Sequence, residues 1–389
     1  MLYYQAELPH IVFLFSDTGG GHRSASEAII EALNLEYPER YNAEMIDIFR
    51  DYAPPPLHYA PEIYPPLTRM PDVWKWWYRI SDGPRRVHFT SRMMYPYVRH
   101  SIDRLLRENP ADLYVSVHPL INAPLLQALG KNRQIPYVTV VTDLVTAHAF
   151  WYHKDADMTV VCTEKARQRA LAAGIDDKKL VTIGLPVADR FCHPQENKTA
   201  LRQQLGWRTD KPVVLLVGGG DGMGPLYKIA RAINHAKPDL ALVVVCGRNR
   251  ELKANLEKLY WQIPAYVYGF VRDMPDLMNA SDILITKAGP GTITEGMISG
   301  LPIILYSRIP GQEEGNVDYV VEQHAGEWAP TAEKVVEVLN RWMKNPDEYK
   351  RMGEASRSLA NPQAAREIAR VLVSRLEKPV PDAGVTRQE

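Results

Sequence analysis

The chain has 389 residues, and its 46 lysines and arginines balance 46 aspartates and glutamates. This balance excludes a nucleic-acid binder that relies on bulk positive charge, and an apolar content of 46% excludes wholesale disorder. The length predicts about two domains. No apolar run approaches the roughly 18 residues of a spanning helix, no signal peptide is visible, and three scattered cysteines are typical of a reducing compartment. We therefore expect a soluble or peripheral intracellular protein.

The first half of the chain alternates short apolar runs with helical or loop segments. Ile11–Phe15 leads directly into a glycine-rich turn, and Ser24–Leu33 has the pattern of a helix. Further strands are expected at Leu113–Val117, Tyr137–Thr142 and Met158–Cys162. Continuous Val/Ile-rich strands that alternate with helices predict a parallel α/β sheet.

One segment, residues 51–95, interrupts this alternation. Seven prolines stand between Pro54 and Pro71, and three of the eight tryptophans follow, at Trp74, Trp76 and Trp77. Between Arg69 and Arg107 there are nine lysines and arginines against three acidic residues, a local excess of six positive charges. Because proline disrupts helices, we expect an irregular insertion here. Its tryptophans either pack as ordinary core or enter a lipid surface.

A polar, proline-containing stretch at 184–212 is expected to link two halves, because a second β-α series begins directly after it. Val213–Val217 is predicted as a strand, followed by a second glycine-rich turn and a helix from about Pro225. Later strands are expected at Leu242–Cys246, Tyr266–Tyr268, Ile283–Thr286 and Ile303–Tyr306. Two such halves predict two Rossmann-like domains that face each other across a cleft.

The glycine-rich turns carry the first chemical signal. In Gly19–His22, consecutive glycines let backbone N–H groups approach a ligand, and the helix that follows points its positive end at the same place. His22 can take up a proton near neutral pH, although a tight turn with a capping histidine explains the same residues. Gly218–Gly224 offers a similar cradle but lacks the P-loop pattern and the ribose-binding acid of an NAD site.

A third constellation lies at Thr286–Glu295. Gly289, Gly291 and the amides of a first helical turn predict another anion cradle. Glu295 stands three residues after Thr292, so the two residues either form a capping box or Glu295 accepts the hydroxyls of a ribose.

The loop at 311–316 is polar and precedes a helix expected at Val317. Gln312, Glu313 and Asn316 offer the mixed donors and acceptors that the hydroxyls of a sugar require, unless Asn316 only caps that helix. Elsewhere His118, His148 and His153 are interpreted as structural, and no His/Cys/Asp grouping has zinc spacing.

Taken together, these runs resemble the monogalactosyldiacylglycerol synthase family, in order and over roughly residues 10–375. The resemblance lies in Ser16–Arg23, Gly218–Pro225, Cys246–Asn249, Thr286–Thr292, Gly311–Asn316, Val117–Leu120, Thr142–Leu144 and Gly184–Val187. It implies a GT-B fold, with an acceptor domain at 1–190 and a UDP-sugar domain at 191–360. It also implies that a helix at about 361–378 packs back onto the first domain, and that 379–389 is a tail.

The implied reaction is an inverting transfer of galactose from UDP-galactose to the 3-hydroxyl of 1,2-diacylglycerol, with no metal or other cofactor. His22 is the expected base, and Asp17 is the candidate to orient it. Glu295 is expected to hold the ribose, the backbone at Phe270–Val271 to meet the uracil, and the 311–316 loop to read the hexose. The full set of expected donor contacts is Gly20, Gly21, Gly219, Gly220, Arg248, Phe270, Val271, Gly289, Pro290, Gly291, Thr292, Glu295, Gln312, Glu313 and Asn316.

A diacylglycerol acceptor implies docking at the cytoplasmic face of a membrane. The residues expected to meet an anionic lipid surface are Trp74, Trp76, Trp77, Arg79, Arg85 and Arg86, and no nucleic acid is expected as a partner. The chain departs from the family at Glu314, where alanine is usual, and over 51–95, which matches loosely. The alternatives are transfer from UDP-glucose to diacylglycerol, a UDP-N-acetylglucosamine transferase of peptidoglycan synthesis, a sugar-nucleotide epimerase of GT-B fold, and a non-catalytic sugar-nucleotide sensor.

Overall fold

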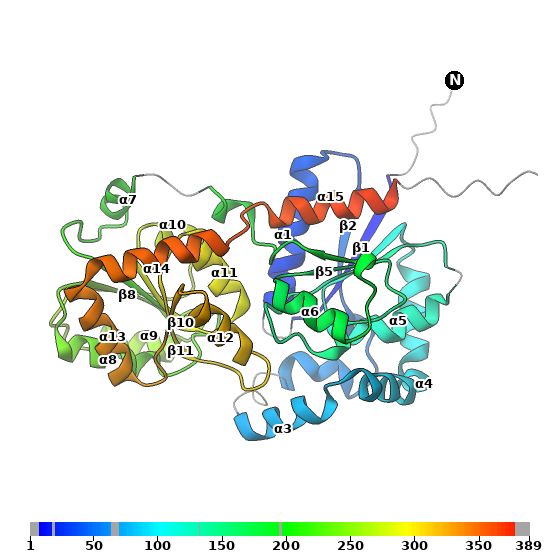
Figure 1. Cartoon of the computed structure of the whole chain (residues 1–389), viewed down its shortest axis with the longest axis horizontal. Coiled ribbons are helices and arrows are strands. Elements are labelled where there is room, and N and C mark those ends of the chain that lie inside the picture. The colour runs from blue at the N-terminus through cyan, green and yellow to red at the C-terminus, as the bar shows by residue number, and fades with distance from the viewer. Residues whose placement is uncertain (1–7, 18–19, 64–69, 132, 194–196, 378–389) are drawn as a thin grey trace, which may run out of the picture.

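The computed structural model describes residues 8–17, 20–63, 70–131, 133–193 and 197–377. These residues form two parallel six-stranded sheets, each flanked by helices (Figure 1). The predicted α/β class with two Rossmann-like domains is confirmed. The first sheet ends at Thr182 and the second begins at Val213, so the expected boundary at 190 falls between them.

The first sheet has the strand order β2-β1-β3-β4-β5-β6. Strand β1, next to the edge strand β2, is buried from Ile11 to Phe15, as expected for a parallel strand covered on both faces. The edge strand β2 escaped prediction because its exposed and part-buried residues alternate, which leaves no continuous apolar run. The strands are β1 His10–Phe15, β2 Asn42–Asp47, β3 Leu113–Ser116, β4 Tyr137–Val140, β5 Met158–Val161 and β6 Leu180–Thr182.

The second sheet has the order β12-β11-β10-β7-β8-β9. Four of its strands are almost wholly buried, whereas the edge strand β9 is half-buried. The short strand β12 was not predicted. The strands are β7 Val213–Val217, β8 Ala241–Val245, β9 Ala265–Tyr268, β10 Ile283–Lys287, β11 Ile303–Ser307 and β12 Gly326–Trp328.

Helices join successive strands in both halves. In the first half these are α1 Gly21–Glu36, α3 Pro71–Ser81, α4 Pro84–Glu108, α5 Asn122–Leu129 and α6 Glu164–Ala172. The later helices are α7 Lys198–Gln204, α8 Leu226–Ala236, α9 Arg250–Glu257, α10 Met274–Asn279, α11 Pro290–Ile298, α12 Glu314–Glu322, α13 Ala332–Lys344, α14 Pro346–Leu359 and α15 Ala364–Leu376. Helix α7 lies within the stretch 184–212 that was predicted to link the two halves.

The segment at 51–95 is more regular than predicted. It contains α3 and the first part of α4, and both helices begin with a proline, Pro71 and Pro84. Proline is compatible with the first helical turn, where its missing N–H has no partner to lose. The expectation of an irregular insertion is therefore wrong for these two helices. The run 64–69 lies outside the described residues.

The last helix, α15, lies against α1 of the first domain (Figure 1). Its apolar face joins the core around β1, and its buried residues include Ile368 and Leu372. Arg370 Nε lies 2.9 Å from a carboxylate oxygen of Glu36 on α1. The tail predicted at 379–389 lies outside the described residues.

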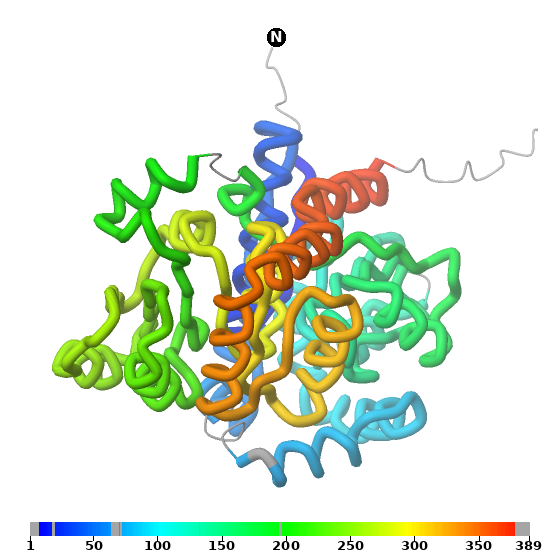
Figure 2. The backbone as a smooth tube through the Cα atoms, turned by 60° about the vertical axis from the view of Figure 1, so that its left-hand side comes forward, coloured from blue at the N-terminus to red at the C-terminus, as the bar shows by residue number. Residues whose placement is uncertain are grey.

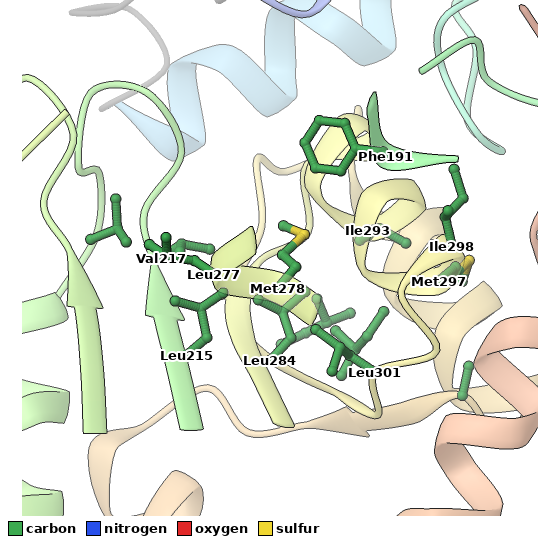
Figure 3. Packing of buried hydrophobic residues seen from close by; sticks show 14 of the residues in the cluster. Phe191, Leu215, Val217, Leu277, Met278, Leu284, Ile293, Met297, Ile298 and Leu301 are labelled. Carbon is green, nitrogen blue, oxygen red and sulfur yellow. The ribbon is translucent and has the colours of Figure 1, made fainter. Parts of the chain in front are cut away.

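The two halves share a continuous apolar cluster. Phe191, in the connection between the domains, belongs to the same buried cluster as Ile293 and Ile298 of α11 (Figure 3). Leu144 of the first domain belongs to the same cluster. Within the described part of the chain, no helix is both long and apolar enough to span a bilayer.

Candidate active site

His22 stands on the first turn of α1, at the carboxyl-terminal edge of the first sheet. Its Nδ1 lies 3.0 Å from the hydroxyl oxygen of Thr142, which follows β4. The rings of His118 and Trp151 lie 4.8 and 5.8 Å from it, centroid to centroid. Burial lowers the pKa of His22 from 6.5 to about 4, partly offset by a hydrogen bond to the Val117 backbone. The imidazole is therefore neutral at pH 7 and able to accept a proton.

Asp17, predicted to orient His22, instead binds Arg23. The guanidinium donates two hydrogen bonds of 2.7 Å, from Nε and Nη2, to the two carboxylate oxygens of Asp17. This pairing holds the pKa of Asp17 below its usual value. The side chain that holds His22 is a neutral hydroxyl, and the prediction of Asp17 as its orienting partner is wrong. Thr18 and Gly19 of the predicted turn lie outside the described residues.

The segment that follows β4 contributes two residues that the sequence reasoning did not assign. Trp151 Nε1 donates a 2.7 Å hydrogen bond to Asp143, whose carboxyl also receives one from the Gln312 side chain of the second domain. Burial raises the pKa of Asp143 to about 6. The signal for Thr142 and Asp143 was their place at the carboxyl end of a parallel strand, where α/β proteins bind ligands.

The Gly218–Gly224 turn follows β7 and is locked to the turn that follows β8. An added Cβ at Gly222, whose φ is +59°, would lie 2.2 Å from the carbonyl oxygen of Cys246. Arg248 N donates a 2.8 Å hydrogen bond to the Gly220 carbonyl. Glycine is therefore required at Gly222 by close approach as well as by conformation.

Arg248 and Phe270 are exposed beside this turn. The guanidinium carbon of Arg248 lies 4.9 Å from the centroid of the Phe270 ring, and Nη1 lies 3.3 Å from Asp221. The charge of Arg248 also lowers the pKa of Asp17. The two domains thus bring Arg248 and the His22 edge into electrostatic range of each other.

Helix α11 begins at Pro290 with Gly289 as its N-cap and no side-chain cap. The helix starts earlier than a capping box at Thr292 and Glu295 requires, so that interpretation is wrong. Burial raises the pKa of Glu295 to about 7, and the charge of Arg190 opposes this rise. An added Cβ at Gly291 would meet nothing within 4 Å. The first amides of a helix have no intrahelical partner, so this end of α11 can bind an anion.

Two buried side chains, Glu313 and Asn316, hold the 311–316 loop in place through hydrogen bonds. Glu313 is 3% exposed, and its carboxylate accepts hydrogen bonds of 2.8 Å from Lys287 Nζ and from the Ile309 amide. Asn316 is buried and donates to the Ala288 carbonyl at 2.9 Å. Because α12 begins at Glu314, the interpretation of Asn316 as the N-cap of a helix starting at Val317 is wrong. The buried Oδ1 of Asn316 has no hydrogen-bond partner within the described residues.

The tryptophans of α3 divide between its two faces. Trp74 is 6% exposed and lies beside Tyr78, one turn later, whereas Trp76 and Trp77 are 64% and 41% exposed. Trp74 is therefore wrongly predicted as a lipid contact, because an amphipathic helix buries one face. The remaining predicted lipid contacts are exposed, at Trp76, Trp77, Arg79, Arg85 and Arg86.

Comparisons with known proteins cover almost the whole chain. The family model "Monogalactosyldiacylglycerol (MGDG) synthase" matches residues 22–187, and "Glycosyltransferase family 28 C-terminal domain" matches 213–370. The "Probable monogalactosyldiacylglycerol synthase, chloroplastic" of Nicotiana tabacum is 38% identical over 370 residues, which is 92% of this chain and 69% of the relative. The "Monogalactosyldiacylglycerol synthase 1, chloroplastic" of Arabidopsis thaliana matches with the same identity and the same two coverages.

A solved structure agrees at the level of the fold. The crystal structure of Acinetobacter baumannii MurG superposes with a TM-score of 0.60 and 16% identity, over 94% of this chain and 99% of that one.

Proposed function

Because this chain belongs to the monogalactosyldiacylglycerol synthase family, we propose that it transfers galactose from UDP-galactose to the 3-hydroxyl of 1,2-diacylglycerol. The observation that carries the proposal is His22: a neutral imidazole held by a hydroxyl, at the edge where α/β enzymes bind substrates. The glycine-rich turns of the second sheet and the N-terminus of α11 bind the UDP-sugar.

His22 acts as the general base. We assign to His22 the tautomer in which Nδ1–H donates to Thr142, 3.0 Å away, so that the lone pair of Nε2 takes the proton of the acceptor hydroxyl. As that proton moves, the acceptor oxygen bonds to C1 of galactose and the bond from C1 to the diphosphate oxygen breaks, releasing UDP. Attack on the face opposite the leaving group inverts the α-linked donor to a β-galactoside.

Backbone N–H groups and one guanidinium stabilise the negative charge of the departing diphosphate. The amides of Gly291 and Thr292 on the first turn of α11, those of Gly219 and Gly220, and the exposed guanidinium of Arg248 provide this stabilisation. We therefore expect the reaction to continue in the presence of EDTA.

The rest of the donor is assigned to neighbouring groups. Glu295, which is part-buried and whose pKa burial raises to about 7, accepts the hydroxyls of the ribose, and the backbone at Phe270–Val271 meets the uracil. Gln312 reads the hexose, whereas Glu313 and Asn316 shape the loop through their contacts with Lys287 and Ala288.

The acceptor reaches the site from a membrane surface. Trp76, Trp77 and the basic residues Arg79, Arg85 and Arg86 are exposed on α3 and the start of α4, and aromatic and basic side chains of this kind favour the interface of an anionic bilayer.

One experiment identifies the sugar donor from the lipid product that each candidate donor gives. The protein is incubated with diacylglycerol vesicles, EDTA and either UDP-galactose, UDP-glucose or UDP-N-acetylglucosamine, and lipids are identified by mass spectrometry. We expect a β-galactosyl lipid from UDP-galactose, and a 10²- to 10⁴-fold slower reaction (about 3–5 kcal/mol) for His22→Ala, which should still bind UDP. A glucosyl product alone would reassign the donor, and absence of glycolipid with every donor would overturn the proposal.

A further inference from the structure

Helix α3 contacts the second domain directly, at the loop that carries Gln312. An added Cβ at Gly311, whose φ is +83°, would lie 3.0 Å from a ring carbon of Tyr78, so the ring packs against bare backbone. One turn earlier on the same helix, Lys75 Nζ lies 3.4 Å from a carboxylate oxygen of Glu314. Figures 1 and 2 both place α3 at the lower edge of the molecule, next to the chain that follows β11.

Tyr78 holds the same loop by a second route. Its hydroxyl donates a 2.5 Å hydrogen bond to the carbonyl of Thr146, and the Thr146 hydroxyl donates to the carbonyl of Gln312. Gly315 packs on this segment as well, since an added Cβ would lie 2.7 Å from Val145. The Tyr78 side chain is buried, which raises the pKa of its hydroxyl and keeps it a hydrogen-bond donor at all working pH values.

The contacts continue from the loop to the cradle of α11. Glu313 binds Lys287, and Lys287 Nζ would lie 2.8 Å from a Cβ added at Gly289, the N-cap of α11. Asn316 binds the Ala288 carbonyl in the same stretch. A continuous set of packed and hydrogen-bonded groups thus runs from Tyr78 to the amides assigned to the diphosphate.

We propose that Tyr78 and Lys75 are positioning residues for the donor loop, so that the helix whose other face exposes Trp76 and Trp77 also sets the affinity for the UDP-sugar. The inference rests on the proposed function, which assigns this loop to the donor hexose. Neither residue is expected to touch the reacting atoms; each holds, from the first domain, the loop that carries Gln312.

The ion pair allows a clean exchange experiment, because both of its side chains are part-exposed, at 37% and 29%. Lys75→Glu and Glu314→Lys each place like charges together and should raise the KM for UDP-galactose roughly two- to fivefold. The double exchange restores an attractive pair and should return KM to the wild-type value. Asp72→Asn, an exposed change on the same helix, is the control.

Tyr78→Phe tests the second route while keeping the ring. Loss of its hydrogen bond to Thr146 should raise the donor KM about fivefold, with kcat within about twofold of the wild type. Activity is measured with short-chain diacylglycerol in mixed micelles, so that bilayer docking does not limit the rate, and thermal unfolding of each variant is recorded in parallel. A role in folding alone would lower the melting temperature and kcat without moving KM.

Two results would overturn the inference: an unchanged donor KM in Tyr78→Phe, or a KM change in the single charge variants that the exchange does not restore. Both leave the wild-type enzyme making galactolipid, so they are distinct from failure of the proposed function. If the wild type makes no glycolipid, the same variants are compared by calorimetric binding of UDP-galactose, where the exchange should again restore affinity and its failure to do so would overturn the inference.

Discussion

The Thr142 hydroxyl contacts Nδ1 of His22, and the ring has a second hydrogen bond, to the Val117 backbone. A hydroxyl can fix the direction of an imidazole ring through Nδ1, but it cannot compensate the charge that the ring gains when it accepts a proton. The low pKa of His22 has a different origin, namely burial, and the neighbouring His118 is kept neutral in the same way. The orientation of the His22 ring therefore depends on its hydrogen bonds and its pKa depends on burial, so different substitutions should change the two properties.

Thr142→Val removes the hydroxyl and keeps the shape of the side chain. We expect kcat to fall about tenfold with little change in donor KM, because loss of one orienting hydrogen bond of about 1.4 kcal/mol acts on the chemical step. Thr142→Ser should retain most of the rate.

The pH profile of kcat/KM distinguishes this role. Burial disfavours the imidazolium, so the base stays unprotonated as pH falls and the acid limb should lie near pH 4 rather than 6.5, in the wild type and in Thr142→Val alike. A limb that moved to about 6.5 in the variant would mean that Thr142, and not burial, controls the pKa.

Helix α11 shows how one element combines structure and binding. Proline at its first position and the absence of a side-chain cap leave its leading amides free of side-chain partners, which is the arrangement that suits an anion. Gly291, on this first turn, has open space where a side chain would stand. Glycine within a helix costs stability, so its presence here is better explained by the ligand than by the fold.

The substitution Gly291→Ala distinguishes the effect of this glycine on helix stability from its effect on ligand binding. Alanine should stabilise the helix by about 0.5–1 kcal/mol, seen as an equal or higher melting temperature. The added methyl group should obstruct the diphosphate and raise the KM for UDP-galactose roughly tenfold, which is about 1.4 kcal/mol. An unchanged KM in a stabilised variant would show that the diphosphate lies elsewhere.

At the scale of the whole molecule, charge and apolar surface are distributed unevenly although the net charge is zero. The exposed large apolar side chains gather on α3 and α4, where Trp76, Phe89 and Met93 are each more than 60% exposed. Exposed arginines stand on the same two helices. Exposed apolar and basic side chains on neighbouring helices favour a lipid interface, so we expect α3 and α4 to face the membrane.

Vesicle binding tests this orientation. The double substitution Trp76→Ala/Trp77→Ala should weaken binding to anionic vesicles at least about tenfold, because two amphipathic rings no longer enter the interface. Tyr260→Ala is the matched control, since Tyr260 is an aromatic residue 85% exposed on the second domain. Equal binding by the double variant and the control would exclude α3 as the docking element.

The sequence by itself determined where most strands of the two sheets lie and which glycine-rich turns follow them. Runs such as Ile11–Phe15 and Val213–Val217 are fully apolar because parallel strands are covered on both faces, and glycines such as Gly222 mark turns where backbones meet. Burial of a strand and close approach at a turn each constrain the residues of one short segment, so a local sequence pattern predicts them. The edge strands β2, β6 and β12 escaped because they are short or only partly covered.

Only the tertiary structure decided which side chains become partners. Thr142, just after β4, pairs with His22, which stands 120 residues earlier in the chain, and Asp143 pairs with Gln312 of the second domain. Lys75 and Glu314 meet across the domain boundary for the same reason. Partner choice depends on distances between segments remote in sequence, and no pattern within one segment contains them.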